Sequence, residues 1–283
     1  MAVDSILIRQ YSDNITLLVQ QKLVKIANTV YQKPDCVGEM SFQEQLESTT
    51  AQEKLSRNEV VVNTDPSYER RKIVPRYFYK APLVDNIDKV MMAKDPTSPI
   101  VINNAGALAR AKDEVVCTAF SALAYYGKAG TSSISLASAQ IIVHSSAGMN
   151  MVKIRAAKKK LDAYEVEEED RYLALSAEQV EDLLAISEVI SADYAQVKAL
   201  VNGQVGTLVG FQLKQTERLE KSSTTRYCHA YHKNGMVLGT WLDMKASIDI
   251  LPGRHFSAQI YAGQSYGATR LEEKRVIRVE CTE

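Results

Sequence analysis

The sequence lacks the closely spaced cysteines from which structural metal sites are usually built. Its cysteines are too far apart to form a CxxC pair, which argues against a zinc or iron–sulfur site; they are Cys36, Cys117, Cys228 and Cys281. Reduced thiols in a cytoplasmic setting are the simplest interpretation. No internal repeat of roughly 20–50 residues is present, which excludes solenoids and propellers.

Neither sign of charge is in excess. Lys and Arg together number 34, and so do Asp and Glu, which excludes a global field that would draw the chain to nucleic acid or to an acidic membrane. The uncharged stretch 115–127 is shorter than the roughly 18 residues that a membrane helix needs. The first residues lack a basic segment followed by an apolar one, so we expect no signal peptide. With 283 residues, 46% of them hydrophobic, the chain can bury a large core.

The common catalytic motifs are also missing. There is no GxxxxGK[ST] loop for phosphate, no GxGxxG and no GxSxG elbow. His144 with Ser145 or Ser146 follows a strand-like segment and is a weak candidate for a nucleophilic pair, because no acid partner can be placed. Cys228 and His232 would share one face of a strand, but two ligands make a poor metal site. We therefore predict no catalytic residues, no metal ligands and no cofactor.

Clusters of one charge occur only locally. Residues 155–160 are rich in Lys and Arg and could touch phosphates, but the acidic block at 165–170 follows at once and cancels their charge. We interpret the basic run as the solvated face of a helix. Asp85 and Asp88 lie on surface-like segments, and nothing places them in a cleft.

The longest regular pattern covers residues 95–126 and predicts one helix around which the chain is organised. Thr97 or Ser98 can cap its start, and Pro99 suits the first helical position. Apolar residues recur at steps of three, four or seven along one side, namely Val101, Ala105, Leu108, Val115, Ala119 and Leu123. Such a helix would be roughly 40 Å long, more than most globular helices.

The segments before this helix look incomplete by themselves. We interpret residues 1–34 as an arm that contains one helix at 14–30. A helix of that length is too short to be stable alone, so we expect it to dock on its own chain or on a neighbour. Residues 35–80 have few large apolar side chains and cannot form a core of their own, so we interpret them as a long flap. We expect its two extended pieces at about 40–46 and 58–64.

The end of the flap carries two further signals. Residues 65–67, Asp-Pro-Ser, predict a turn. The charged run 69–72 fits either a solvated face or a contact with a neighbouring subunit. Residues 72–80 partly alternate, as a strand entering a core should.

The remainder mixes helices with strands and ends mostly in strands, which predicts an α+β or α/β arrangement. From 140 to 213 we expect strands at 140–143, 171–175 and 207–213, and helices at 149–164, from Ser176 onward with Gln179 completing a capping box, and at 191–200. The final strands are expected at 226–232, 235–241, 255–261 and 274–281.

The order of these parts and several specific residues resemble the major capsid proteins of tailed phages. The most specific piece is Asp95-Pro96-Thr97-Ser98-Pro99 followed by Arg110-Ala111-Lys112-Asp113-Glu114-Val115-Val116 and Ala119. Other matching positions are Arg71, Tyr77, Val84-Asp85, Asp88, Arg171-Tyr172-Leu173, Asp193-Tyr194, Gly210-Phe211 and Gly267-Ala268-Thr269-Arg270. The similarity covers about residues 40–283.

The resemblance implies the Hong Kong phage-type capsid fold, an α+β fold shared with encapsulins and herpesvirus capsid floors. It implies the following division: an N-arm (1–34), an extended E-loop (35–80), a peripheral domain with the spine helix (81–130), an axial domain (131–250) and return strands to the peripheral sheet (251–283). Some such capsids join their subunits by Lys–Asn isopeptide bonds. No such pair can be placed in this sequence, so we expect no covalent chemistry.

The function implied is that of a structural shell protein of the virion, assembled in the host cytoplasm from hexamers and pentamers and enclosing DNA. The implied partners are further copies of the chain, a separate scaffolding protein, a portal protein and DNA held by weak non-specific contact, with no membrane. Two alternatives stay open. One is an encapsulin-like compartment with enzyme cargo, and the other is a soluble hydrolase that uses His144 and Ser145 or Ser146.

Overall fold

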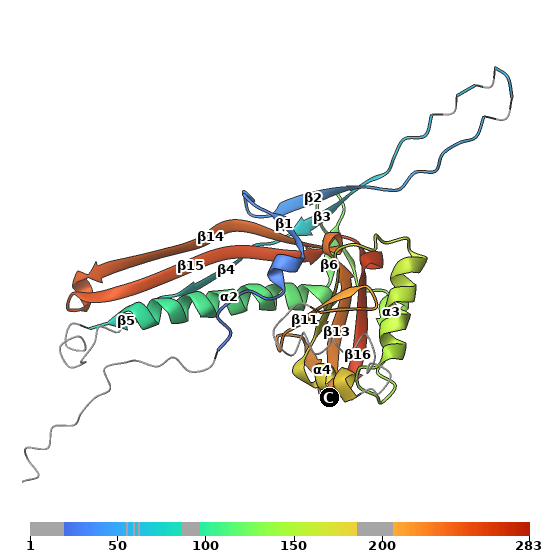
Figure 1. Ribbon diagram of the computed structural model, residues 1–283. Coiled ribbons are helices and arrows are strands. Elements are labelled where there is room, and N and C mark those ends of the chain that lie inside the picture. The colour runs from blue at the N-terminus through green and yellow to red at the C-terminus, as the bar shows by residue number, and fades with distance from the viewer. Residues whose placement is uncertain (1–19, 55, 59, 62, 86–96, 186–205) are drawn as a thin grey trace, which may run out of the picture.

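The predicted long helix is the axis of the computed structural model, which describes residues 20–54, 56–58, 60, 61, 63–85, 97–185 and 206–283 (Figure 1). Helix α2 covers Thr97–Ser121 and is about 37 Å long at 1.5 Å per residue. Leu108, Val115 and Ala119 are buried as predicted, whereas Val101 is 38% exposed. The predicted capping side chains of Thr97 and Ser98 lie outside what the structure describes.

The predicted end of the helix at Tyr126 is wrong. Helix α2 stops at Ser121. The buried guanidinium of Arg270 donates hydrogen bonds there to the carbonyls of Phe120 (2.8 Å) in the last turn and of Ala122 (2.5 Å) just after it, and so satisfies groups that the helix leaves unpaired. The following residues form strand β6, Ala124–Tyr126. Leu123, predicted on the apolar side of the helix, lies outside it and is exposed.

A five-stranded sheet lies along α2. Its order is β1-β14-β15-β4, with β5 also paired to β15. The strands are β1 (Tyr31–Lys33), β4 (Arg76–Lys80), β5 (Leu83–Val84), β14 (Met236–Leu251) and β15 (Ser257–Arg270). Strands β14 and β15 form a long antiparallel hairpin, and Gln264 Nε2 donates to the Leu108 carbonyl of α2 at 2.8 Å. The hairpin and the helix together make one elongated blade (Figure 1).

A seven-stranded sheet carries most of the hydrophobic core. Its order is β10-β11-β9-β13-β16-β8, with β12 paired to β13. The strands are β8 (Ile141–Ile142), β9 (Arg171–Leu175), β10 (Thr207–Leu208), β11 (Phe211–Gln215), β12 (Lys221–Ser222), β13 (Thr225–His232) and β16 (Val276–Thr282). Helices α3 (Met151–Ala163) and α4 (Ala177–Ala185) pack here. Phe120 of α2 stacks on His229 of β13 and makes a tilted ring contact with Tyr231 of the same strand.

A smaller four-stranded sheet joins the flap to the end of the helix. Its order is β2-β3-β6-β7, with β2 at Ser41–Leu46, β3 at Tyr68–Ile73 and β7 at Ser132–Ile134. Short 3-10 turns lie at Ala27–Thr29, Ser138–Gln140, Lys233–Gly235, Pro252–Arg254 and Glu273–Arg275. Within the residues described, no helix is both long and apolar enough to cross a membrane.

Several predicted elements are confirmed. Strand β9 has the predicted bounds and all its residues are buried. Helix α3 begins after Asn150, whose side chain accepts from the Lys153 N–H. The capping box at α4 is present in part, because the Ser176 N–H donates to Gln179 Oε1 at 3.2 Å. The helix expected at 191–200 lies outside the described residues.

The predicted helix at 14–30 is wrong over its described part. Residues 20–26 form no helix and Ala27–Thr29 form only a 3-10 turn, after which Lys33 belongs to β1. The backbone N–H groups of Ile26 and Ala27 donate to the Asp113 carboxylate of α2 and are held in an irregular loop. The prediction that the arm docks on its own chain or on a neighbour is confirmed for its own chain.

The flap is a hairpin, but its second strand is misplaced in the prediction. Strand β2 pairs with β3 at 68–73, while the described residues of 58–64 form no strand. The Asp-Pro-Ser segment therefore leads into β3 and is not the turn. Likewise, 207–213 is a hairpin, because Val209 (φ 53°) and Gly210 (φ 86°) turn the chain between β10 and β11.

The strand expected at 72–80 is broken and mostly exposed. Strand β3 ends at Ile73 and β4 begins at Arg76, with Tyr77 and Tyr79 more than half exposed. The break is where the chain crosses β15: a Cβ atom at Gly267 would lie 2.1 Å from the Val74 carbonyl oxygen. Only glycine fits that crossing.

The last strands divide between two sheets. Strand β15 pairs along the blade as expected for a return strand, but β16 lies in the seven-stranded sheet between β13 and β8. Strand β14, predicted within 131–250, is part of the blade and runs well past the predicted 235–241. Of the return strands expected over residues 251–283, β15 therefore lies in the sheet beside the helix and β16 does not.

Candidate assembly interface

The outer flap, residues 47–67, projects away from the rest of the chain as a thin loop (Figure 1). Cross-strand pairing ends where the Glu47 N–H donates to the Ser67 carbonyl at 3.0 Å. The described residues of 48–66 contain no helix or strand, and Val60 and Val61 are 83% and 82% exposed. Two adjacent exposed valines on an extended loop are available to be covered by another molecule.

The stem of the flap, formed by the paired strands β2 and β3, is in contrast firmly attached. Arg71 is buried, ion-paired with Glu273 at 2.8 Å and stacked over the Tyr126 ring. Gln45 Nε2 donates to the Leu271 carbonyl at 2.9 Å. Of the charged run 69–72, Arg71 therefore serves the fold within its own chain. The stem is fixed, and the direction in which the outer flap leaves the molecule is set by these contacts.

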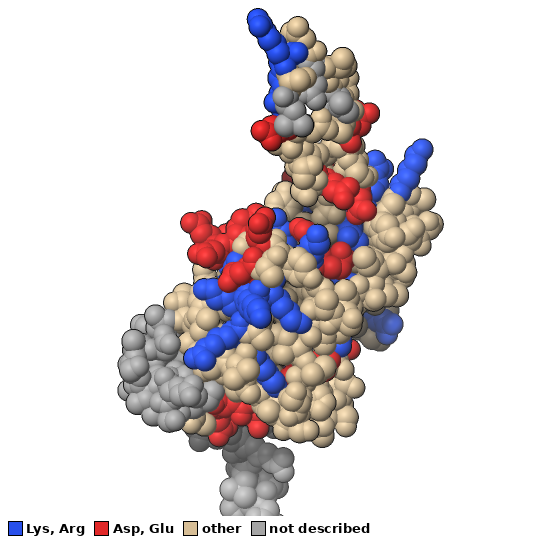
Figure 2. All heavy atoms as spheres, turned by 90° about the vertical axis from the view of Figure 1, so that its right-hand side faces the viewer, with Lys and Arg blue, Asp and Glu red and all other residues tan. Residues whose placement is uncertain are grey.

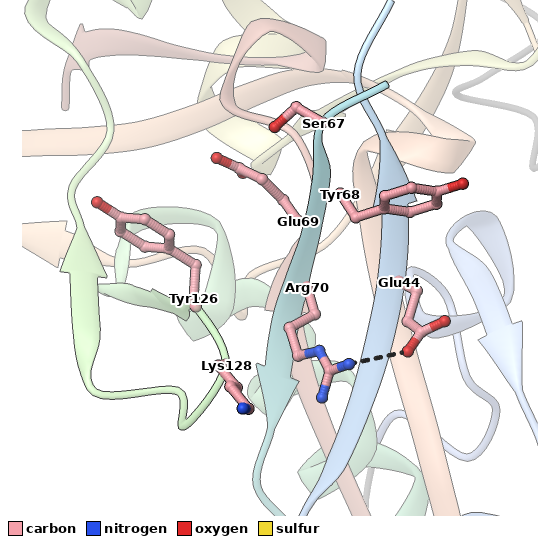
Figure 3. Close-up of a pocket in the computed structure, with 8 residues that line it drawn as sticks. Glu44, Ser67, Tyr68, Glu69, Arg70, Tyr126 and Lys128 are labelled. Atoms are coloured by element: carbon pink, nitrogen blue, oxygen red, sulfur yellow. Dashed lines mark hydrogen bonds and ion pairs between the residues drawn. The ribbon is translucent and has the colours of Figure 1, made fainter. Parts of the chain in front are cut away.

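An open recess of about 490 Å³ lies beside the stem (Figure 3). Arg70 and Glu44, which lie opposite each other on strands β3 and β2, both line it and form an exposed ion pair at 3.2 Å. The lining is a mixture of rings, charges and backbone: Glu44, Ser67, Tyr68, Glu69, Arg70, Tyr126, Gly127 and Lys128. Such a mixed, shallow surface suits contact with a protein segment better than capture of a small molecule.

The arm is held by one buried carboxylate. Asp113 of α2 is fully buried and accepts hydrogen bonds from the N–H groups of Lys25 (2.9 Å), Ile26 (3.0 Å) and Ala27 (2.9 Å), and from Gln21 Nε2 (2.5 Å). A carboxylate surrounded by donors is stable when buried. The arm segment from Gln21 to Ala27 is thus fixed against the middle of the long helix.

The weak hydrolase candidates are not arranged for catalysis. His144 Nδ1 accepts from the Ser146 backbone N–H at 3.0 Å, so the ring stabilises its own turn. Ser145 and Ser146 both have left-handed φ angles, of 48° and 52°, which shape that turn. The bond comes from a backbone amide, whereas a nucleophilic pair needs the serine hydroxyl to reach the ring.

The Cys/His strand is part of the core. Cys228, His229 and His232 of β13 are all buried. Burial, with smaller contributions from Arg278 and Arg270, lowers the pKa of His229 to about 3, so the ring stacked on Phe120 is neutral. No group of three or more His, Cys, Asp or Glu in the described part of the chain could hold a metal ion. Asp85 lies just beyond β5, and Asp88 lies outside the described residues.

The comparisons with known proteins agree with these features. The family model for phage capsid protein matches residues 3–283. A search of curated proteins gave no match. The capsid structure of Cyanophage P-SCSP1u superposes with a TM-score of 0.75 at 13% identity, over 100% of this chain and 95% of that one. A structure of Mycobacterium phage Che8 gives 0.72 at 19% identity, over 98% of each chain.

The capsid of Ralstonia phage GP4 matches with a TM-score of 0.75 at 10% identity, over 97% of this chain and 94% of that one. These likenesses establish the Hong Kong phage-type capsid fold over the whole length. The described part of the chain shows an anchored stem and exposed valines on the outer flap. The family match covers nearly every residue, and the chain therefore belongs to the phage capsid protein family, as a major capsid protein of the virion's head shell.

Proposed function

We propose that the outer flap of each copy lies over the blade of a neighbouring copy and so links the subunits into hexamers and pentamers of a closed icosahedral shell. The observation that carries this proposal is the contrast within the flap between a fixed stem and uncovered valines. The exposed residues of the blade offer a matching apolar surface, including Met244, Ile248 and Ile250 of β14. If the outer flap of one copy covered the blade of the next, the apolar surface buried between them would stabilise the pair in a way that is not possible in the single chain.

The blade also supplies a pocket for such a contact. An opening of about 230 Å³ lies between the first turns of α2 and the hairpin, and its lining is almost wholly apolar. It includes Val101 and Ala105 from the helix with Met244, Ile248 and Ile260 from the strands. Each contact can be weak, because a shell repeats it many times and the copies already joined raise the effective concentration of the next contact.

The domain division that we propose follows the sheets and not the order of the chain. The peripheral part comprises α2 with the five-stranded sheet, and the axial part comprises the seven-stranded sheet with α3 and α4. The arm crosses the peripheral part at Asp113, and the E-loop consists of β2, β3 and the outer flap.

The further partners are proposals as well. We propose that a separate scaffolding protein sets the size of the shell, that a portal protein occupies one vertex, and that assembly takes place in the host cytoplasm. The balanced charge of the chain supports weak, non-specific contact with the packaged DNA, because 34 basic residues are offset by 34 acidic ones.

Deletion of residues 48–66, with Glu47 and Ser67 joined by Asn-Gly, tests the role of the outer flap. We expect a folded, soluble chain that forms no particles, because the stem contacts of Arg71 and Gln45 are kept. Negative-stain microscopy and light scattering measure assembly, and circular dichroism measures the fold. Unfolding of the deletion variant would show that the flap belongs to the core, and normal particles would show that another contact links the copies.

A further inference from the structure

The turn after helix α3 carries acidic side chains that the chain itself leaves unpaired. Glu165, Glu168 and Glu169 are exposed, and none of them makes an ion pair within the described part of the chain. The backbone of the turn is held by Arg171 Nε, which donates to the Glu167 carbonyl at 2.7 Å. The unpaired glutamates, which we call the acidic turn, therefore present negative charge from a fixed position.

The arm carries unpaired charge of the opposite sign. Lys22 and Lys25 are exposed and make no ion pair among the residues that the structure describes. Between them lies Leu23, which is 79% exposed and so leaves an apolar side chain available to the same neighbour. Gln21 Nε2 donates to the Leu23 carbonyl at 2.8 Å. The Lys25 N–H donates to the Asp113 carboxylate at 2.9 Å, so the backbone of this segment is fixed as well. We call the two lysines the basic arm.

The acidic turn and the basic arm lie on opposite sides of the seven-stranded sheet. Thr29 of the arm contacts Tyr231 of β13, on the face that α2 also covers. Cys281 of β16 pairs with Arg226 and therefore points to the other face. Helix α3 lies on that other face, since Lys153 Nζ is 4.0 Å from Cys281 Sγ. Figure 1 shows the arm to the left of this sheet and α3 to its right, and Figure 2 shows a cluster of acidic side chains on the α3 side.

The direction of the outer flap decides which surfaces of two copies meet. The flap leaves the molecule on the α3 side (Figure 1), so the neighbour that it reaches lies on that side. Every copy in a closed ring repeats the same contact, so the α3 side of each copy meets the arm side of the next. We propose that the acidic turn of each copy binds the basic arm of the next copy, head to tail around the hexamers and pentamers. The proposal rests on the proposed shell function.

The chemistry of this contact determines how it responds to salt and to substitution. Exposed ion pairs are individually weak and are screened over about 8 Å at 0.15 M salt, so the contact weakens as the salt concentration rises. Its repetition around each ring makes the weak pairs count together. Reversing the charge of one patch brings like charges together at every contact, whereas reversing both patches in the same chain restores attraction.

The first test compares three full-length variants with the unmodified chain: K22E/K25E, E168K/E169K and the combination of all four substitutions. At 0.15 M salt we expect each double variant to lower the yield of closed particles by about tenfold and the combination to restore it to within about twofold. The combination carries every substitution, so it is also the control for their effects on the single chain. Sedimentation and negative-stain microscopy measure the yield.

A mixture of the two double variants tests the head-to-tail order itself. In this mixture only unlike copies attract each other, so the copies must alternate around a ring. A ring of six can alternate completely, whereas a ring of five must contain one pair of like copies. A closed icosahedral shell needs rings of five. We therefore expect sheets or tubes of hexamers, with at most about a tenth of the closed particles that the unmodified chain gives.

Each outcome supports the contact or overturns it. Losses in both double variants without rescue in the combination would show that the two patches do not meet. Unchanged yield in every variant would overturn the contact and leave the shell function standing, and a full yield of closed shells from the mixture would exclude the head-to-tail order. Failure of the unmodified chain to form particles, alone or with its scaffold, would overturn the shell function and this contact together.

A second pair of variants covers the case in which a charge reversal unfolds the chain. If circular dichroism shows such unfolding, K22Q/K25Q and E168Q/E169Q remove the charges without reversing them. Both should then lower the yield by a smaller factor in the same direction, because attraction is lost but no repulsion is added. An unchanged yield in both of these folded variants would overturn the contact.

Discussion

The outer flap and the β14–β15 hairpin both extend far from the rest of the chain, yet only the hairpin is supported along its length by its own chain. Strands β14 and β15 stay paired from Met236↔Arg270 to Leu251↔Ser257, and β4 and β5 extend the sheet on the β15 side. Helix α2 covers part of one face, with Asn104 and Leu108 bonded to β15 residues. Pairing in the flap ends at Leu46↔Tyr68, and the described residues beyond form no further strand.

The difference shows that backing by a helix, and not strand length, decides which excursion is complete. An isolated two-stranded ribbon is marginal in water, and it becomes stable when a third strand or a helix covers it. The hairpin has both kinds of support, whereas the flap has a third strand, β6, only at its stem. The outer flap is thus the part of the fold that a neighbouring copy can complete.

We expect the largest loss of stability from substitution of Arg270, which lies at the base of the hairpin. Its guanidinium bonds to the carbonyls of Phe120, Ala122 and Ile134, and so joins the hairpin to both the end of α2 and strand β7. We expect Arg270→Met to lower the free energy of unfolding by about 4 kcal/mol, because several buried carbonyls lose their donor. Chemical denaturation measures this, with Arg254→Met at the exposed hairpin tip as the control. A loss below about 1 kcal/mol would show that water replaces the guanidinium.

Asp113 gives the next largest effect, because the arm depends on it. In Asp113→Asn the new amide group would face backbone donors at Lys25 or Ile26, so we expect a loss of about 2 kcal/mol and release of the arm. Limited proteolysis should then cut between residues 20 and 30 before it reaches the core. Glu114→Gln, at the exposed neighbouring position, should leave both readouts unchanged. An uncut arm in Asp113→Asn would mean that Arg110 and the β1 pairing suffice to hold it.

Local patterns allowed the regular elements to be predicted, but not the contacts that position them. Strand β9, helix α3 and most of α2 follow from periodicity and caps. The hydrogen bonds of Asp113 to the arm and those of Arg270 to the end of α2 join residues about 90 and 150 positions apart in the sequence. No local sequence pattern indicates contacts of that range. One signal was present: Asp113 shares a helical side with Val116 and Phe120, where a carboxylate must find donors.

The same limit explains the misplaced strands. The valines at 60–62 suggested a strand at 58–64 by propensity, yet β3 forms from the more polar 68–73 because β2 and β6 are there to pair with it. Strand β16 was assigned to the sheet beside the helix, although it inserts between β13 and β8. Both errors concern which strands pair with one another. The flap was recognised as a candidate interface only because its sequence has too few large apolar residues to pack within its own chain.

The smallest effect on stability is expected from substitutions in the outer flap, and these test the contrast between the flap and the hairpin most directly. In the double variant Val60→Ser/Val61→Ser the free energy of unfolding should change by less than about 0.5 kcal/mol, because both side chains are exposed in the single chain. The matched variant Ile248→Ser/Ile250→Ser, exposed on β14, should cost about 1–2 kcal/mol, because these residues lie in a paired strand opposite Ile260 and Ala258. Denaturation separates the two variants, and microscopy should show that the flap variant nevertheless loses particles. If the flap valines cost as much as the hairpin isoleucines, the outer flap is already packed within its own chain, and a neighbour is not needed to cover it.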